Sequence, residues 1–238
     1  MTDAIVRKAL IFGRETPYRH GMAHYERLSP TDATFLRIET DHEPQHVGSL
    51  SVLDGAPLRD PDGRLRIDEL RTHVARRLSR VPRLRQKVME VPYSQGTPVW
   101  IDDADFDIEF HVRLTSLPRP GDDEQLSTLM GRLQSLPLDR GRPLWEMWFI
   151  DGLADDEVGL VIKTHHALGD GIANVDLALA LVDTSPEVVD EVDPPAFRPR
   201  PAPTSQDLLV DGVISQMLQP IRLGQSLLRA VRDPRPAI

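Results

Sequence analysis

An apolar run that breaks into two adjacent histidines and a Gly-Asp-Gly turn constrains the fold of this chain more than any other feature. Residues 158–162 are mostly branched and apolar, which is typical of a buried strand. His165, His166 and Asp170 follow, and residues 172–182 are rich in Ala and Leu, as in a packed helix. The pattern predicts two imidazoles and a carboxylate at a strand-to-helix corner, where polar side chains can meet a ligand without disturbing the core.

The residue types at this corner suit proton transfer. Neutral imidazole can take a proton from an alcohol and return it, because its unperturbed pKa lies near 6.5. A positioned general base contributes about 10²–10⁴ in rate. We expect Asp170, between two glycines, to point inward, pair with a cation and hold the corner rigid. Gly171 would allow a positive φ or a close approach of the backbone.

The corner and three further segments together resemble a known family. Residues 165–171 match the HHxxxDG motif of the CoA-dependent acyltransferase superfamily, a motif shared with condensation domains and polyketide-associated acyltransferases. The other matches are LSPTDATFL at residues 28–36, QHVG at residues 45–48 and PLWE at residues 143–146. Four matches in this order make the chain resemble the bacterial wax ester synthase/diacylglycerol acyltransferase family.

The resemblance implies both a fold and a reaction. The fold would be α/β (mixed α+β) and similar to chloramphenicol acetyltransferase, with a mixed sheet flanked by helices. The reaction would move a fatty acyl group from acyl-CoA, a substrate and not a cofactor, to diacylglycerol or a long-chain alcohol. His166 would take the proton of the alcohol, His165 would shape the pocket, and Asp170 and Gly171 would be structural.

Two further residues are candidates for substrate binding. Residues 46–53 are predicted to form a strand, and the resemblance places His46 near the active-site channel. A lone strand histidine is otherwise simply half-exposed. Two tryptophans on opposite faces of residues 143–150 predict a strand buried on both sides, in which Trp145 is a core side chain. The resemblance adds that this element lies beside the catalytic strand and shapes the site.

Other interpretations of the histidines stay open. The pair can be a hydrogen-bonded strand end without a function. A metal site needs three or four convergent ligands, and no other His or Cys lies nearby in sequence, so we expect no metal. His165 to Asp170 also spells the HxxxxD pattern of glycerolipid acyltransferases. Those enzymes usually carry membrane-embedded apolar segments, whereas no run here approaches the roughly 20 residues of a spanning helix.

Composition excludes several classes of function. The net charge of −9 argues against nucleic-acid binding, which requires clustered Lys and Arg. The absence of cysteine excludes disulfides, thiolate metal sites and a cysteine acyl-enzyme, and the absence of Gly-x-Ser-x-Gly leaves a serine acyl-enzyme without its usual support. We expect a cytoplasmic protein that can associate with the inner face of the membrane or with a lipid-droplet surface.

Patterning elsewhere predicts the remaining elements. Ser29 before Pro30 predicts the start of one helix. A second helix is predicted over residues 122–136, because acidic residues lie in the first turn of that segment. Alternation over residues 105–114 predicts a half-buried strand with His111 on its wet face.

Arginines mark two further places. Helical spacing over residues 70–81 predicts an amphipathic helix whose arginine face is solvated or contacts the 3′-phosphate of CoA; this face carries Arg71, Arg76, Arg77 and Arg80. Arg140 and Arg142 are the candidate cations for Asp170.

The chain is predicted to divide into four parts. Residues 1–22 are a flexible leader, residues 23–185 the N-terminal acyltransferase domain and residues 186–204 a proline-rich linker. Residues 205–238 form an amphipathic helical segment that packs on protein or lies on a membrane surface. The resemblance implies that this segment leads to a C-terminal domain missing from this chain. Two alternatives stay open: a non-catalytic half that needs a C-terminal partner, and a polyketide-associated type of acyltransferase with another acceptor.

Overall fold

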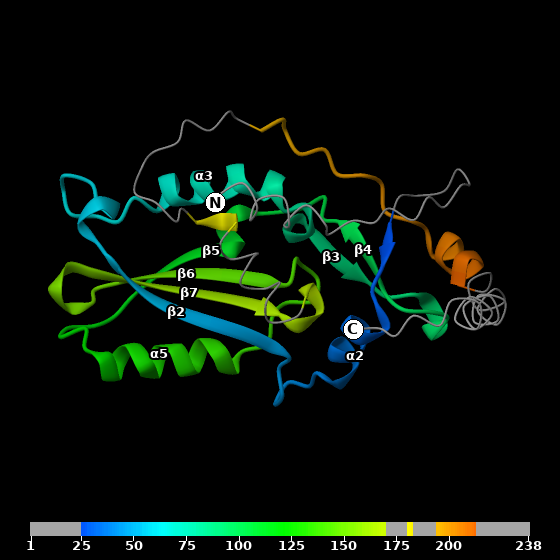
Figure 1. Ribbon diagram of the computed structural model, residues 1–238, viewed down its shortest axis with the longest axis horizontal. Helices are drawn as coiled ribbons and strands as arrows, with labels where there is room; N and C mark the ends of the chain where they lie inside the picture. Colours follow the sequence, from blue (N-terminus) through cyan, green and yellow to red (C-terminus); the bar gives the residue numbers. More distant parts are fainter. Residues whose placement is uncertain (1–24, 170–179, 183–193, 213–238) are drawn as a thin grey trace, which may run out of the picture.

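The computed structural model describes residues 25–169, 180–182 and 194–212 of the chain, and Figure 1 shows how these parts are arranged. Its centre is a four-stranded sheet in the order β2-β7-β6-β5. The strands span His46–Asp54 in β2, Glu157–His165 in β7, Trp145–Asp151 in β6 and Val112–Ser116 in β5. β5 pairs with β6 in parallel and the other neighbours are antiparallel, so the sheet is mixed, as expected.

Helices cover both faces of this sheet (Figure 1). α3 (Ile67–Arg77) lies over one face and α5 (Asp123–Ser135) over the other. The α3 side holds the larger core, where Val74 and Leu78 pack with Met147 and Leu160. The two interior strands are therefore buried on both sides, and the strand of the two tryptophans is confirmed in β6.

A smaller sheet has the strand order β1-β4-β3. Its strands are short, with β1 at Glu26–Arg27, β4 at Val99–Asp102 and β3 at Gln86–Met89. Residues 205–212 are helical and pack on this sheet, where Leu208 is fully buried against Val91 and Val99. Short 3₁₀ turns connect the elements at Ala56–Leu58, Leu78–Arg80, Pro82–Arg85, Pro92–Ser94, Ala154–Asp156 and His166–Leu168 (η1 to η6).

Two helix starts follow the predicted capping chemistry. α2 (Pro30–Ile38) begins after Ser29, whose side chain accepts a hydrogen bond from the Asp32 N–H. α5 begins after Asp122, which accepts from the Gln125 N–H while the Gln125 side chain reaches back to the Asp122 N–H. Of the helices that the structure describes, none is long and apolar enough to cross a membrane.

The strand predicted over residues 105–114 is wrong. Residues Ile108–His111 form a helical turn, α4, and only the segment from Val112 onward is a strand. Asp107 is the reason, because its side chain accepts from the Glu109 N–H and starts the turn. The turn directs His111 inward, so this side chain is fully buried and not on a wet face.

The arginine face of α3 is also less solvated than predicted. Arg77 is 4% exposed. The Arg71 Nε donates to the Val112 carbonyl at 3.1 Å, and its guanidinium pairs with Asp68 and Glu109. The aliphatic stems of arginine cover apolar surface while the charged ends reach carbonyls and acids, so such a face is partly internal.

Candidate active site at the end of strand β7

The site is built where β7 ends and the 3₁₀ turn η6 begins. The His165 side chain ends the strand itself, because its Nδ1 accepts a hydrogen bond from the Ala167 N–H at 2.9 Å. His166 is thereby the first residue of the turn and lies at the edge of the core. The sequence prediction of a histidine pair at the end of a buried strand is thus what the structure shows.

His166 is half-buried and is held by two neighbours. Its backbone N–H donates to the Gln45 carbonyl at 2.9 Å. Its ring stacks on Phe35 of α2, with ring centroids 4.8 Å apart and an angle of 21° between the planes. The His166 imidazole therefore has a fixed backbone and one face covered by an aromatic ring.

His165 is fully buried and uncharged at neutral pH. Burial lowers the pKa of its imidazole from 6.5 to about 4, although the nearby Glu39 carboxylate acts in the opposite direction. Since Nδ1 accepts from Ala167, the ring proton is on Nε2, which faces Glu39 Oε1 at 3.3 Å. The ring is thus fixed in one tautomer.

Glu39 is the residue of this site that the sequence interpretation missed. Its side chain is 4% exposed. Arg140 donates to its Oε2 from Nε at 2.9 Å, and the Arg140 Nη2, which donates to the Leu36 carbonyl, lies 2.7 Å from the same oxygen. Burial acts to raise the pKa of Glu39, but hydrogen bonds from the Gln45 N–H and from Arg140 outweigh it, and the pKa lies below its usual value. One signal was present in the sequence: an acid at the C-terminal end of a helix opposes the helix dipole.

His46 lies directly opposite His165 in the β2–β7 register. Its Nε2 donates to the Gln134 carbonyl at 2.9 Å, near the end of α5, and burial lowers the pKa of its ring. Lys163, the next inward position on this face, donates from Nζ to the Leu133 carbonyl at 2.9 Å and also to Leu136. The His46 ring is thus bound to the C-terminal end of α5. Its role in substrate binding stays a prediction.

Trp145 lies in the core behind the site. It is 1% exposed, its indole N–H donates to the Leu84 carbonyl at 2.8 Å, and its ring stacks on His111 at 4.6 Å. The His111 Nδ1 donates to the Trp145 carbonyl at 2.7 Å. Trp145 is thus a core residue that packs behind the two histidines. Its part in substrate binding also stays a prediction.

Two predicted site residues, Asp170 and Gly171, lie outside the described residues. The two candidate cations for Asp170 are described. Arg140 is bound to Glu39, and Arg142 lies 4.0 Å from Asp139 with its guanidinium over Phe110. Within the part of the chain that the structure describes, no group of three His, Cys, Asp or Glu side chains could hold a metal ion.

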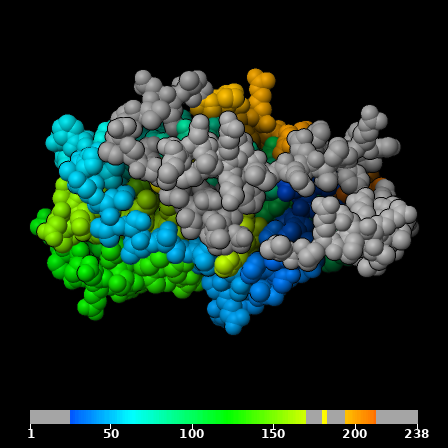
Figure 2. Space-filling model, viewed as in Figure 1, coloured from blue at the N-terminus to red at the C-terminus, as the bar shows by residue number. Residues whose placement is uncertain are grey.

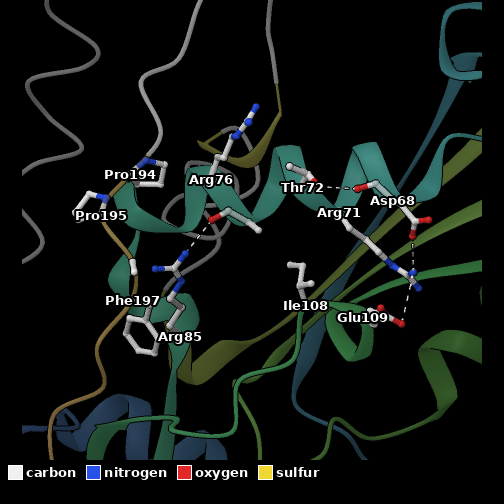
Figure 3. Close-up of a pocket in the computed structure, with 12 residues that line it drawn as sticks. Asp68, Arg71, Thr72, Arg76, Arg85, Ile108, Glu109, Pro194, Pro195 and Phe197 are labelled. Atoms are coloured by element: carbon white, nitrogen blue, oxygen red, sulfur yellow. Dashed lines mark hydrogen bonds and ion pairs between the residues drawn. The ribbon is translucent and has the colours of Figure 1, made fainter.

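A separate pocket lies under α3 (Figure 3), and neither His165 nor His166 is among the residues that line it. It has a volume of about 490 Å³ and is lined by α3, by Ile108 and Glu109, and by residues 194–197. Figure 3 shows that Arg71 turns toward Asp68 and Glu109, and that Arg85 turns toward the α3 backbone, where it donates to the Ala75 carbonyl. Contact with a CoA phosphate on this side stays a prediction.

Comparisons with known proteins agree with the sequence motifs. The family model described as "wax ester synthase/diacylglycerol acyltransferase catalytic domain" matches residues 28–234. The chain is 43% identical over 171 residues to tgs3 of Mycobacterium tuberculosis, named a probable diacylglycerol O-acyltransferase, with 72% of this chain and 59% of that protein covered. It is 41% identical over 160 residues to tgs1 of the same species, which covers 66% of this chain and 33% of that one.

Solved structures give the same fold. The wax ester synthase/diacylglycerol acyltransferase of Marinobacter aquaeolei VT8 superposes with a TM-score of 0.57 at 28% identity, over 84% of this chain and 46% of that one. A starter condensation domain of rhizomide synthetase superposes with a TM-score of 0.51 at 13% identity, over 67% of this chain and 36% of that one, which shows the fold alone. The chain therefore spans 59% of the mycobacterial protein tgs3 and 46% of the Marinobacter enzyme.

Proposed function

The chain belongs to the wax ester synthase/diacylglycerol acyltransferase family, and from this premise we propose that it carries the histidine base of an O-acyltransferase. The donor is an acyl-CoA, and the acceptor is diacylglycerol or a long-chain alcohol. The observation that carries the proposal is the placement of His166, a half-buried imidazole at the end of a buried strand, with its backbone bound to Gln45 and its ring stacked on Phe35.

The reaction is a direct transfer. His166 takes the proton of the acceptor hydroxyl while the hydroxyl oxygen attacks the thioester carbonyl of acyl-CoA. The new C–O bond gives a tetrahedral oxyanion, which collapses, breaks the C–S bond and releases the CoA thiolate. The imidazolium then returns its proton to the thiolate sulfur, so that the base is regenerated. No cofactor takes part in these steps.

His165 supports this chemistry without taking the proton. Its Nδ1 is occupied by the Ala167 N–H, and its Nε2 carries a hydrogen that faces Glu39. A ring with one nitrogen engaged as an acceptor and the other protonated has no lone pair left for an alcohol. The two adjacent histidines therefore divide their roles, with His165 forming the corner and His166 acting as the base.

The remaining walls of the channel are proposed to come from a C-terminal acyltransferase domain. This chain spans 59% of tgs3 and 46% of the Marinobacter enzyme, and positioning of the two substrates supplies a large part of catalysis. We expect the 238-residue chain alone to transfer acyl groups weakly or not at all, and to gain activity with a C-terminal partner. A peripheral contact with a membrane or lipid-droplet surface would supply the lipid acceptor.

The test is an acyl-CoA assay with diacylglycerol and hexadecanol as acceptors, run on the chain alone and mixed with the separately produced C-terminal half of the Marinobacter enzyme, of which this chain covers 46%. His166→Ala is expected to lower turnover by about 10²–10⁴-fold without unfolding the protein. His73→Ala, which replaces a half-buried histidine on α3, is the matched control and is expected to retain turnover.

The outcomes separate the proposal from its alternatives. Near-normal turnover in His166→Ala would remove the role as a base. Turnover with neither acceptor, alone or with the partner, would favour a non-catalytic half. Preference for a different hydroxyl acceptor in competition would favour a polyketide-associated type of acyltransferase.

A further inference from the structure

Glu39 is placed in an unusual way for a carboxylate at the end of a helix. It is the residue that ends α2, and its side chain turns inward. Taking a carboxylate out of water is unfavourable unless the group is paired and hydrogen-bonded. Arg140 supplies the pairing through Oε2 alone, with contacts of 2.9 and 2.7 Å from two of its nitrogens. The second oxygen, Oε1, is therefore left for other partners.

Both partners of Oε1 belong to the histidine corner. The Gln45 N–H donates to Oε1 at 3.0 Å, and the His165 Nε2 lies 3.3 Å from the same oxygen. The contact with Gln45 is a hydrogen bond, whereas the contact with His165 is an electrostatic one, because its alignment is poor for a hydrogen bond. One oxygen atom thus joins the start of β2 to the end of β7.

The peptide of Gln45 carries this link to His166. Its N–H is bound to Glu39, and its carbonyl accepts from the His166 N–H at 2.9 Å. Glu39 is therefore two hydrogen bonds away from the backbone of the proposed base. Any shift of the carboxylate moves the Gln45 peptide and with it the His166 backbone.

The same helix also supports the His166 ring. Phe35 and Glu39 are four residues apart at the end of α2, so they lie close to the same side of the helix. Phe35 stacks on the His166 ring, and Glu39 reaches the backbone through Gln45. If Glu39 is displaced, the end of α2 is free to move away from the ring.

We propose that Glu39, fixed by Arg140, is a positioning residue that sets the place of His166 at the end of β7. The catalytic part of this inference rests on the proposed function. The geometric part does not, because it concerns contacts within the folded chain.

The test uses the number of acceptor oxygens. Glu39→Gln replaces two acceptor oxygens by one, so the side chain cannot accept hydrogen bonds from Arg140 and from the Gln45 N–H on separate oxygens. In the assay above, we expect kcat to fall about 10–100-fold with KM changed less than about 3-fold, as for a displaced catalytic group. Hydrogen exchange of the His166 amide is expected to be about tenfold faster. The ¹⁵N NMR signature of His165 as an Nε2–H tautomer is expected to stay, because the Ala167 N–H still donates to its Nδ1.

A second variant tests whether the loss arises from the competing arginine. In Glu39→Gln with Arg140→Met, the single amide oxygen is free to face Gln45 and His165. We expect the His166 amide protection and most of kcat to return. Asp151→Asn is the matched control, since it removes an ion pair with Arg59 at the other end of β6 and should change none of these readouts.

Unchanged His166 amide protection and kcat in Glu39→Gln would overturn the proposal. A folded double variant that recovers neither would also overturn it. Normal turnover in His166→Ala would instead contradict the proposed function, and the exchange of the His166 amide would still decide the positioning role.

Discussion

At the residue scale, two histidines reach the same electrostatic state by different routes. His165 is carried into the core by the end of β7, and His111 by the helical turn of α4. Burial lowers the pKa of each from 6.5 to about 4, so both are neutral at pH 7. The first placement could be predicted, because an apolar run leads into it. The second could not, because the turn depends on one side-chain contact of Asp107.

This burial makes stability depend on pH. An unfolded chain protonates each imidazole near pH 6.5, whereas the folded protein protonates His111 and His165 only near pH 4. Between these values the unfolded state binds more protons, so stability falls as pH is lowered from about 6.5 to about 4. From pH 7 to pH 5, each of the two histidines accounts for a loss of about 2 kcal/mol in the free energy of unfolding.

His111→Asn tests this prediction. The asparagine amide can donate to the Trp145 carbonyl in place of Nδ1, but it does not titrate. Urea unfolding at pH 7 and pH 5 is expected to show a pH-dependent loss about 2 kcal/mol smaller than in the wild type. The absolute stability of the variant is lower, because the ring between Phe106 and Trp145 is gone, and only the difference between the two pH values matters. An equal loss in both proteins would contradict the prediction.

At the element scale, local chemistry determined which predictions from sequence were confirmed. α2 and α5 were predictable because caps and helical spacing agree. β2, β6 and β7 were predictable from apolar runs and alternation. The small sheet was not, because strands of two to four residues carry too short a pattern to detect. The pairing of Glu39 with Arg140 was equally hidden, since 101 residues separate them.

The end of α5 depends on a buried cation from the sheet. Lys163 is 1% exposed and donates to the Leu133 and Leu136 carbonyls, which have no partner within the helix. Lys163→Met keeps the aliphatic volume and removes the donors. We expect the free energy of unfolding to fall by about 1–3 kcal/mol, since carbonyls lose their partner.

Arg132→Met is the control for Lys163→Met. Arg132 lies in the last turn of α5 but is exposed, so its replacement removes a charge near the helix end and no buried donor. Its effect in urea unfolding is expected to stay below about 1 kcal/mol. Equal losses in the two variants would mean that the charge stabilises the helix end and the hydrogen bonds do not.

At the scale of the whole molecule, β2 forms one edge of the main sheet and most of its side chains are exposed. Figure 2 shows this strand, in pale blue, on the surface above the green residues of α5. Toward the C-terminal side of the described residues, residues 194–203 have no regular secondary structure, as a proline-rich linker predicts. The sequence could not show where this segment is held, because its contacts are with residues about a hundred positions away. The predicted domain boundaries stay predictions.

Arg200 ties this segment to the small sheet. Its Nε and Nη2 donate to the two oxygens of Asp102, each at 3.0 Å, and its backbone N–H donates to Oδ2 at 3.0 Å. Arg200 and its neighbours hold the pKa of Asp102 down, to about 2, although burial acts to raise it. Three residues earlier, Phe197 lies against the Arg85 guanidinium at 4.9 Å. The ion pair and the ring contact therefore hold one stretch of the linker in place.

Arg200→Ala is expected to release this stretch without unfolding the sheets. Arg200 is half exposed, and the buried Asp102 keeps its hydrogen bond from the Gln86 side chain, so the loss is expected to act mainly on local opening. Chymotrypsin cleavage after Phe197 is therefore expected to be about 3–10-fold faster, while the urea midpoint changes little. Arg64→Ala is the control, because Arg64 is exposed and lies far from the cleaved bond, so its replacement removes an arginine without changing the cleavage site. Equal cleavage rates in the two variants would mean that the prolines and Phe197 hold the segment, and that the bidentate contact does not.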